Sequence, residues 1–205
     1  MALVKYNNNS ISAVTSAASI PSGAMTLIKT LTASSSATLS FVDGSDGVTL
    51  DSTYPIYLFK FINMHSASND IPFQFQVNAS GQTGFNETIT STAFDAYHAE
   101  NGSAAALRYL TGSDQAQGTG YQNLSTGTNG NDESQSGELW LYGISSTTFV
   151  KHFMSRFQDT HSSYTTDQYV AGYINTTSAI DEVSFKYSSG NIDFGKIKLY
   201  GIKDS

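Results

Sequence analysis

The chain has 205 residues, of which 13% are charged and 12% aromatic, with a formal net charge of −7 and no cysteine. Disulfides, cysteine catalysis and cysteine-bound zinc are therefore excluded, and the lack of a Lys/Arg cluster argues against nucleic-acid binding by phosphate neutralisation. The composition favours one domain of short strands joined by Gly, Ser, Thr and Asn turns, because helices usually carry more Glu, Lys and Arg.

The N-terminal residues differ from the rest of the chain. Residues 1–23 are mostly small and polar and lack a dense apolar period, so they are expected to form an extended arm ahead of a domain at 24–205. Within this arm, Val4, Ile11 and Val14 are spaced as docking anchors that could add a strand to a neighbour's open sheet edge. The sequence has neither a signal-peptide core nor an apolar run that could cross a bilayer, so we expect synthesis in a cytoplasm without membrane insertion.

Apolar residues recur with a period of two through most of the remaining chain, which is the pattern of half-buried strands. In the clearest example, Phe73, Phe75 and Val77 alternate with Gln74 and Gln76. In chain order, nine strands are predicted at 24–32, 37–42, 54–64, 71–77, 137–144, 148–157, 169–175, 182–187 and 195–202.

The segments between these strands carry other signals. "DGSDG" at 43–47 predicts a hairpin turn between two strands, because Asp-Gly accepts the positive φ angles of such turns. Residues 91–100 fit either a strand or a helix, and "SAAALRYL" at 103–110 predicts a short helix. Residues 111–136 form a long polar insertion, for which a disordered or plain surface loop and a contact role both remain open.

One phrase occurs twice: "GELWLYGI" at 137–144 returns as "GKIKLYGI" at 195–202. Only this short phrase matches, so the sequence indicates two strands in comparable positions of a two-sheet fold and no tandem repeat. The aliphatic residues of both copies are expected to face the core, namely Leu139, Leu141, Ile197 and Leu199. We therefore predict an all-β protein, an antiparallel two-sheet sandwich of jelly-roll-like type, with an immunoglobulin-like sandwich and a closed barrel as alternatives.

Two predicted strands are apolar on both faces and would need cover on both sides. In 54–64, Tyr57, Phe59 and Phe61 lie opposite Ile56 and Leu58, and 148–157 contributes Phe153 in a similar pattern. The aromatic residues of these strands are therefore interpreted as contacts with the arm or with another subunit of a homo-oligomer, expected to be a trimer; they are Tyr57, Phe59, Phe61 and Phe153.

The sequence contains few catalytic constellations. His152 and His161 flank Arg156 and Asp159, and a hydrolytic site is conceivable there, but a strand histidine and a loop histidine explain the pattern more simply. Adjacent carboxylates in turns are usually solvated. Asp43 and Asp46 offer oxygen ligands for calcium, but a calcium-binding loop of the EF-hand type needs many more ligands at fixed spacing. We predict no enzymatic activity, no cofactor and no metal site.

Binding through aromatic side chains has more support. Trp140, the only tryptophan, shares a face with Tyr142, and Tyr121 lies in the polar insertion. Flat aromatic rings among polar side chains suit both the stacking of sugar rings and the anchoring of protein partners. A glycan, a protein partner and cover by a loop of the same subunit all remain open for these residues.

Three stretches carry a resemblance: "SSGNIDFGKIKLYGI" at the end, "YPIYLFKFINMHSASNDIPFQFQVNASG", and the opening "MALVKYNNNSISAVTSAASIPSGAMTLIKTLTASSSATLSF". Together they resemble a family of virion structural proteins of tailed bacteriophages that infect marine bacteria. The resemblance implies a component of the exterior of the phage particle, made in the host cytoplasm, whose partners are other virion proteins, itself and a host-surface glycan.

Three functions are compatible with this resemblance. The first is an external appendage or tail-fibre-like module whose jelly-roll head contacts the host surface. The second is a capsid decoration (cement) protein that stabilises the shell. The third is a glycan-binding module associated with polysaccharide degradation. The resemblance brings no catalytic motif that could be carried over to this chain.

Overall fold

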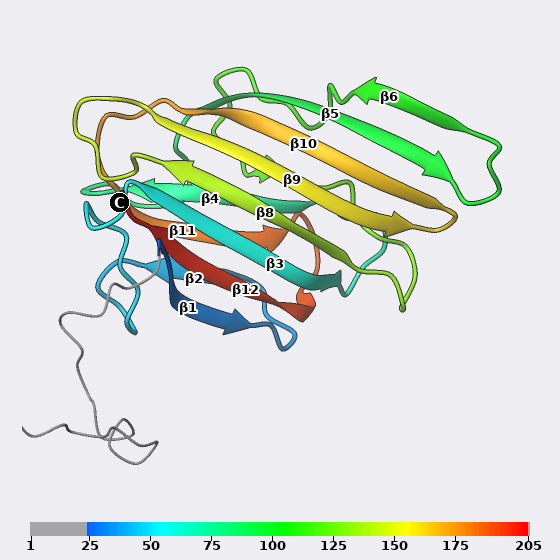
Figure 1. Ribbon diagram of the computed structural model, residues 1–205, viewed down its shortest axis with the longest axis horizontal. Coiled ribbons are helices and arrows are strands. Elements are labelled where there is room, and N and C mark those ends of the chain that lie inside the picture. Colours follow the sequence, from blue (N-terminus) through cyan, green and yellow to red (C-terminus); the bar gives the residue numbers. More distant parts are fainter. Residues whose placement is uncertain (1–23, 205) are drawn as a thin grey trace, which may run out of the picture.

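A computed structural model describes residues 24–204, and these residues form two antiparallel β-sheets packed as a sandwich (Figure 1). The eight-stranded sheet, here called the large sheet, has the order β1 (Met25–Thr32), β12 (Ile192–Ile202), β3 (Ile56–Ser66), β8 (Gln135–Tyr142), β9 (Lys151–His161), β10 (Tyr164–Ile174), β5 (Ile89–Ala99) and β6 (Ala105–Tyr109). The four-stranded small sheet has the order β2 (Leu39–Val42), β11 (Ile180–Tyr187), β4 (Phe73–Ala79) and β7 (Gln122–Asn123).

Strands from the first half of the chain pair with strands from the second half. The first four strands alternate between the sheets, and each pairs with a later strand: β1 with β12, β2 with β11, β3 with β12 and β8, and β4 with β11 and β7. The antiparallel two-sheet sandwich is therefore confirmed, with the nested pairing of a jelly-roll-like ribbon. The proposed arm at 1–23, with Val4, Ile11 and Val14, lies outside the described residues.

Phenylalanine rings from both sheets fill the core between them. Phe59 and Phe61 of β3 each lie with ring centroids 5.1 Å from Phe185 of β11, and Phe75 of β4 lies 5.1 Å from Phe153 of β9. All five rings are at most 2% exposed. Aromatic pairs at such distances add to the free energy gained by burying their apolar area.

The core explains the doubly apolar strand at 54–64 without a second subunit. Tyr57, Phe59 and Phe61 face the small sheet and are buried inside the sandwich, as is Phe153. On the other face of β3, Leu58 is only 1% exposed and lies between Trp140 and Tyr200 of the flanking strands. The interpretation of the four aromatic residues as oligomer contacts is therefore wrong, because their own chain already covers them.

The repeated phrase occupies the two strands that flank β3. Leu139 of β8 and Leu199 of β12 both lie opposite Phe59, and all four aliphatic residues predicted to face the core are fully buried. Only glycine fits at position 201, because a Cβ atom there would lie 2.4 Å from the ring of Tyr54. The two copies of the repeated sequence thus have equivalent positions, because β8 and β12 flank the aromatic strand β3 on its two sides.

Two local predictions need correction, and the structure settles one that was left open. The expected helix at 103–110 is the edge strand β6, paired with β5, and the ambiguous segment 91–100 belongs to the strand β5. "DGSDG" does form a turn, but it is no hairpin, because the chain enters it from β2 of the small sheet and leaves it toward β3 of the large sheet. Within residues 24–204 there is no helix long and apolar enough to cross a membrane.

The polar insertion at 111–136 is an ordered part of the sandwich. Gln122 and Leu124 are buried, and the Leu124 amide donates to the Phe73 carbonyl at the start of β4. At Gly127, φ is +102° and a Cβ atom would lie 2.7 Å from the backbone of Ile71, so the insertion passes too close to the segment before β4 for a side chain. The insertion therefore closes the free edge of the small sheet.

Candidate binding site

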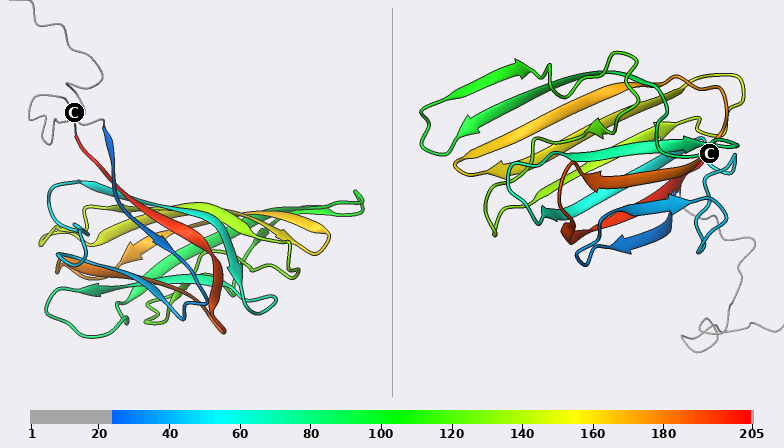
Figure 2. Two further views of the ribbon diagram at one scale, coloured as in Figure 1. Left: turned by 90° about the horizontal axis from the view of Figure 1, so that it is seen from below. Right: turned by 180° about the vertical axis from the view of Figure 1, so that it is seen from behind.

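The small sheet leaves part of the large sheet uncovered. Viewed from behind, β10, β5 and β6 extend beyond the small sheet, and only the insertion crosses part of their inner face (Figure 2). Along β10 this inner face changes from apolar Val170 to polar Gln168 and Thr166, which pair with Asp95 and Tyr97 of β5. The inner face is thus polar at the end where the small sheet no longer covers it.

A pocket of about 390 Å³ opens at this polar end and is called the inner pocket below. Its volume falls in the lower part of the range of about 300 to 1,000 Å³ that ligand sites occupy. It is lined from β5, β6, β9, β10 and the insertion by Tyr97, Arg108, His161, Tyr164, Thr166 and Thr126.

Arg108 is held in place by a buried carboxylate. Its Nε donates to Asp95 Oδ1 at 3.0 Å and its Nη2 donates to Oδ2 at 2.6 Å, while Asp95 is completely buried. This bidentate bond fixes the plane of the guanidinium, which lies 4.2 Å from the ring centroid of Tyr97, and it raises the pKa of Arg108. The guanidinium side of the pocket is therefore preorganised.

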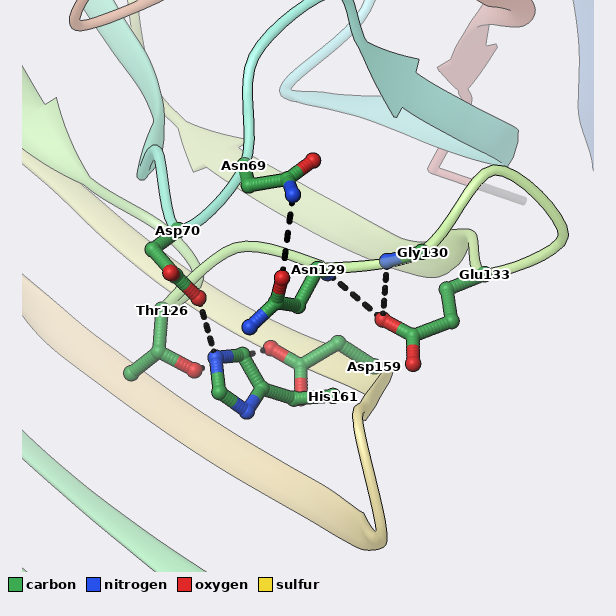
Figure 3. A network of polar contacts seen from close by, with 8 residues as sticks. All are labelled: Asn69, Asp70, Thr126, Asn129, Gly130, Glu133, Asp159 and His161. Carbon is green, nitrogen blue, oxygen red and sulfur yellow. Dashed lines mark hydrogen bonds and ion pairs between the residues drawn. The ribbon is translucent and has the colours of Figure 1, made fainter.

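A polar network fastens the loops at the rim of the pocket to the end of β9 (Figure 3). His161 Nε2 lies 2.5 Å from Asp70 Oδ1, and Thr126 Oγ1 donates to Asp159 Oδ2 at 3.0 Å. In the same network, Glu133 Oε2 accepts hydrogen bonds from the backbone amides of residues 129 and 130. These contacts join two loops that are distant in sequence to the end of β9.

Two buried side chains near the pocket retain unused hydrogen-bonding capacity. Asp159 Oδ1 and both amide atoms of Gln168 have no partner in the described part of the chain, although both residues are fully buried. Asp159 pairs directly with Thr166 of the pocket wall, and Gln168 is the next residue on the same face of β10. Unpaired buried polar groups are rare in proteins, and an unassigned ligand or ion is one of the explanations for them.

The charge of Asp159 gives a testable pH dependence. Burial raises the pKa of Asp159, although hydrogen bonds from threonines oppose the shift. The pKa of Asp159 is thus higher in the folded than in the unfolded state, where it is about 3.9. Below the unfolded-state pKa the folded protein keeps the full benefit of the protonated acid. This benefit is lost as the pH rises through the folded-state pKa. We expect Asp159→Asn to increase the free energy of unfolding at pH 7, because the neutral amide carries no charge that must be desolvated.

Denaturant unfolding of both proteins at pH 7 and near pH 3 measures this effect. The gain should be present at pH 7 and vanish near pH 3, where the carboxyl group is protonated in both states. Asp132→Asn, at an exposed loop position, is the matched control and should change little at either pH. A loss of stability of Asp159→Asn at pH 7 would show that the charged form is the stabilising one.

The aromatic residues predicted to bind do not form one site. Trp140 and Tyr142 lie together on the outer face of the large sheet and line a hollow of about 190 Å³ with Met154 and Tyr169. Tyr121 contacts Phe85 and lies under the ammonium group of Lys186, whose strand β11 belongs to the other sheet. Trp140 and Tyr142 are thus brought together, whereas Tyr121 is separated from them by the thickness of the sandwich.

The polar groups of the outer face are already paired. Lys60 lies 3.1 Å from Glu138, and Arg156 lies 2.7 Å from Asp167 and 5.1 Å from the ring centroid of Tyr169. Burial alone would raise the pKa of Glu138, but hydrogen bonds from Trp140 and Lys60 lower it. A larger hollow of about 490 Å³ runs along these ion pairs, and a ligand there would have to compete with them.

The conceivable hydrolytic site is split by the alternation of β9. Asp159 and His161 lie toward the inner pocket, whereas His152 and Arg156 are exposed on the outer face. The turn acids at 43 and 46 have local structural partners, since Asp43 Oδ1 accepts the Leu50 amide and Asp46 pairs with Lys29. Among residues 24–204, no group of three or more His, Cys, Asp or Glu residues is placed to hold a metal ion.

Sequence reasoning considered His161 only for a hydrolytic site, which it set aside, and it missed the other pocket residues. The available signal was a polar residue at alternate positions of otherwise apolar strands, as with Asp95 in β5 and Gln168 in β10. Such residues must find partners inside the fold, which suggests a buried network but does not reveal its members.

Comparisons with models of protein families, with curated proteins and with solved structures found no match for this chain. A function must therefore be inferred from the placement of its own residues.

Proposed function

We propose that the chain is a non-enzymatic structural component of a tailed phage virion, an external appendage or tail-fibre-like module whose sandwich contacts the host surface. The sequence resemblance described above supports the virion assignment. The geometry of the sandwich supports the appendage role, through one observation.

That observation is the placement of the chain ends and the inner pocket at opposite ends of the strands. Ala24 and Lys203 lie side by side, joined by a hydrogen bond from the Lys203 amide to the Ala24 carbonyl. β10 runs from Tyr164 beside the pocket to Ile174, and the registers place Ile174 at the same end of the sheet as the start of β1. A module attached through the residues before Ala24 would therefore carry its pocket at the end of the sheet that lies away from the attachment. Figure 1 shows the strands of the large sheet that run between these two ends.

A capsid decoration protein is the second candidate, and one observation favours it. At the corner formed by β5 and β6, Phe94, Leu107 and Tyr109 are 40%, 73% and 56% exposed. Contiguous exposed apolar groups often mark contacts with other proteins, and shell subunits would provide such contacts.

Copy number in purified virions separates the two candidates. Quantitative mass spectrometry with isotope-labelled peptides of this chain and of the major shell protein should find far fewer copies of this chain than of shell subunits. Copies in a fixed ratio close to that of the shell subunits would indicate a decoration protein instead. Absence from purified virions would overturn both assignments.

A further inference from the structure

The inner pocket combines an aromatic wall with an exposed ring. Tyr97 and Tyr164 pack edge to face, with ring centroids 5.7 Å apart and planes at 64°. Arg108 lies over Tyr97, whereas Tyr164 is 36% exposed at the start of β10. A flat ligand can therefore stack on Tyr164, and the C–H faces of a sugar ring suit such a surface.

The pocket also offers hydrogen-bond donors and acceptors. Asp95 occupies Nε and Nη2 of Arg108, so Nη1 of this half-exposed side chain remains as a donor. Thr126 Oγ1 donates to Asp159 Oδ2, and Thr166 lines the pocket directly opposite Asp159 in the strand pair. A threonine hydroxyl oxygen has two lone pairs, so both side chains can accept a hydrogen bond. Sugar hydroxyl groups both donate and accept, and this mixed set can satisfy them.

The charges of the pocket favour an uncharged ligand. Arg108 is paired with Asp95, and His161 lies against Asp70. Within the described residues, the Arg108 guanidinium of the pocket wall is thus matched by a carboxylate, and Asp159 lies behind Thr166. The guanidinium charge is thus already balanced for a uronic acid or a sulfated sugar, whereas a neutral hexose needs no unpaired cation.

We propose that the inner pocket binds an uncharged hexose unit of a surface polysaccharide, stacked on Tyr164 and hydrogen-bonded by Arg108, Thr126 and Thr166. The source of the glycan, the host surface, rests on the proposed virion function; the pocket chemistry does not. The outer hollow beside Trp140 is a poorer candidate, because it has about half the volume of the inner pocket.

Saturation-transfer NMR and titration calorimetry with a defined set of disaccharides test this site. Lactose, cellobiose, maltose and α-mannobiose serve as neutral probes, with digalacturonate and a sulfated galactobiose as charged probes. We expect at least one neutral probe to bind and both charged probes to bind more weakly. Tyr164→Ala should weaken the binding by about tenfold through loss of the stacking surface, whereas Tyr164→Phe should stay within about twofold.

Two controls locate the binding site. Phe149→Ala removes a ring that is 71% exposed outside the pocket, and it should leave the affinity unchanged. Trp140 is the only tryptophan, so its fluorescence reports on the outer hollow and should not respond to the sugar.

Several results would overturn the inference. They are binding of the charged probes alone, binding that survives Tyr164→Ala while shifting the Trp140 fluorescence, and no binding by any probe. Failure of the virion assignment is distinguishable, because sugar binding by a protein that is absent from virions would leave the pocket proposal standing.

Discussion

Replacing Phe185 by alanine is expected to lower the free energy of unfolding by about 3 to 5 kcal/mol. Phe185 projects from β11 of the small sheet, is fully buried, and lies within 6.2 Å, centroid to centroid, of the rings of Phe41, Phe59, Phe61 and Phe73. Its truncation would leave a cavity at the place where the two sheets meet, and the surrounding strands can collapse only partly.

Urea unfolding followed by far-ultraviolet circular dichroism measures this loss. Phe149→Ala is the matched control, because it removes the same ring from an exposed position and should cost little. Equal and small effects of the two substitutions would contradict the description of the sheet-to-sheet core. A helical spectrum of the unsubstituted protein would contradict the fold itself.

Replacing Lys151 by methionine is expected to lower the free energy of unfolding by about 2 kcal/mol. Lys151 is completely buried at the start of β9, and its Nζ donates to the carbonyl groups of Ser146, Phe149 and Thr176 at 2.6, 3.0 and 3.2 Å. A buried acceptor left without a donor costs about 1 to 3 kcal/mol. Burial lowers the pKa of Lys151, so removing this desolvated charge offsets part of the loss.

The same unfolding experiment tests Lys151, with Lys196→Met at an exposed position of β12 as the control. The control should leave the stability nearly unchanged. A Lys151→Met protein as stable as the original would show that the three carbonyl groups do not depend on this ammonium group, and that the loops on either side are held by other contacts.

The strands with strict alternation could be located from the sequence, because one of their faces is buried over its whole length. Phe73, Phe75 and Val77 behave in this way, as do the two copies of the repeated phrase. The strand β6 could not be predicted from the sequence, because Ala, Leu and Arg favour helices. Only the pairing of β6 with β5 overrides that preference. The destination of the chain after "DGSDG" was equally hidden, since a turn does not tell which sheet receives the next strand.

The aromatic residues of β3 were correctly predicted to be covered, but the covering element was wrongly assigned to another subunit or to the arm. Strong apolarity on both faces of a strand indicates burial on both faces, and the covering element can belong to the same chain or to another. Here Phe59 meets the small sheet and Leu58 lies between Trp140 and Tyr200. Local sequence cannot separate these cases, because much of the cover comes from residues that are distant in sequence, such as Phe185, Trp140 and Tyr200.

The inner pocket could not be predicted from the sequence, because its residues come from segments that meet only in the folded sheet. Tyr97 and Arg108 meet because β5 and β6 form a hairpin, but Tyr164 and Thr126 join them only after β10 pairs with β5 and the insertion folds over the sheet. Sequence reasoning placed the binding surface at Trp140, where the structure has a smaller hollow crossed by ion pairs. A pocket assembled from five segments leaves no local motif.

An electron cryomicroscopy map of the intact virion tests the central claim most directly. The claim is that the sandwich is mounted by the end where Ala24 and Lys203 meet, with the inner pocket directed away from the particle. We expect density for this fold on an external appendage, with Ala24 toward the particle and Tyr164 toward solvent. Density that places the Tyr164 end against the shell, or a virion without this fold, would contradict the account.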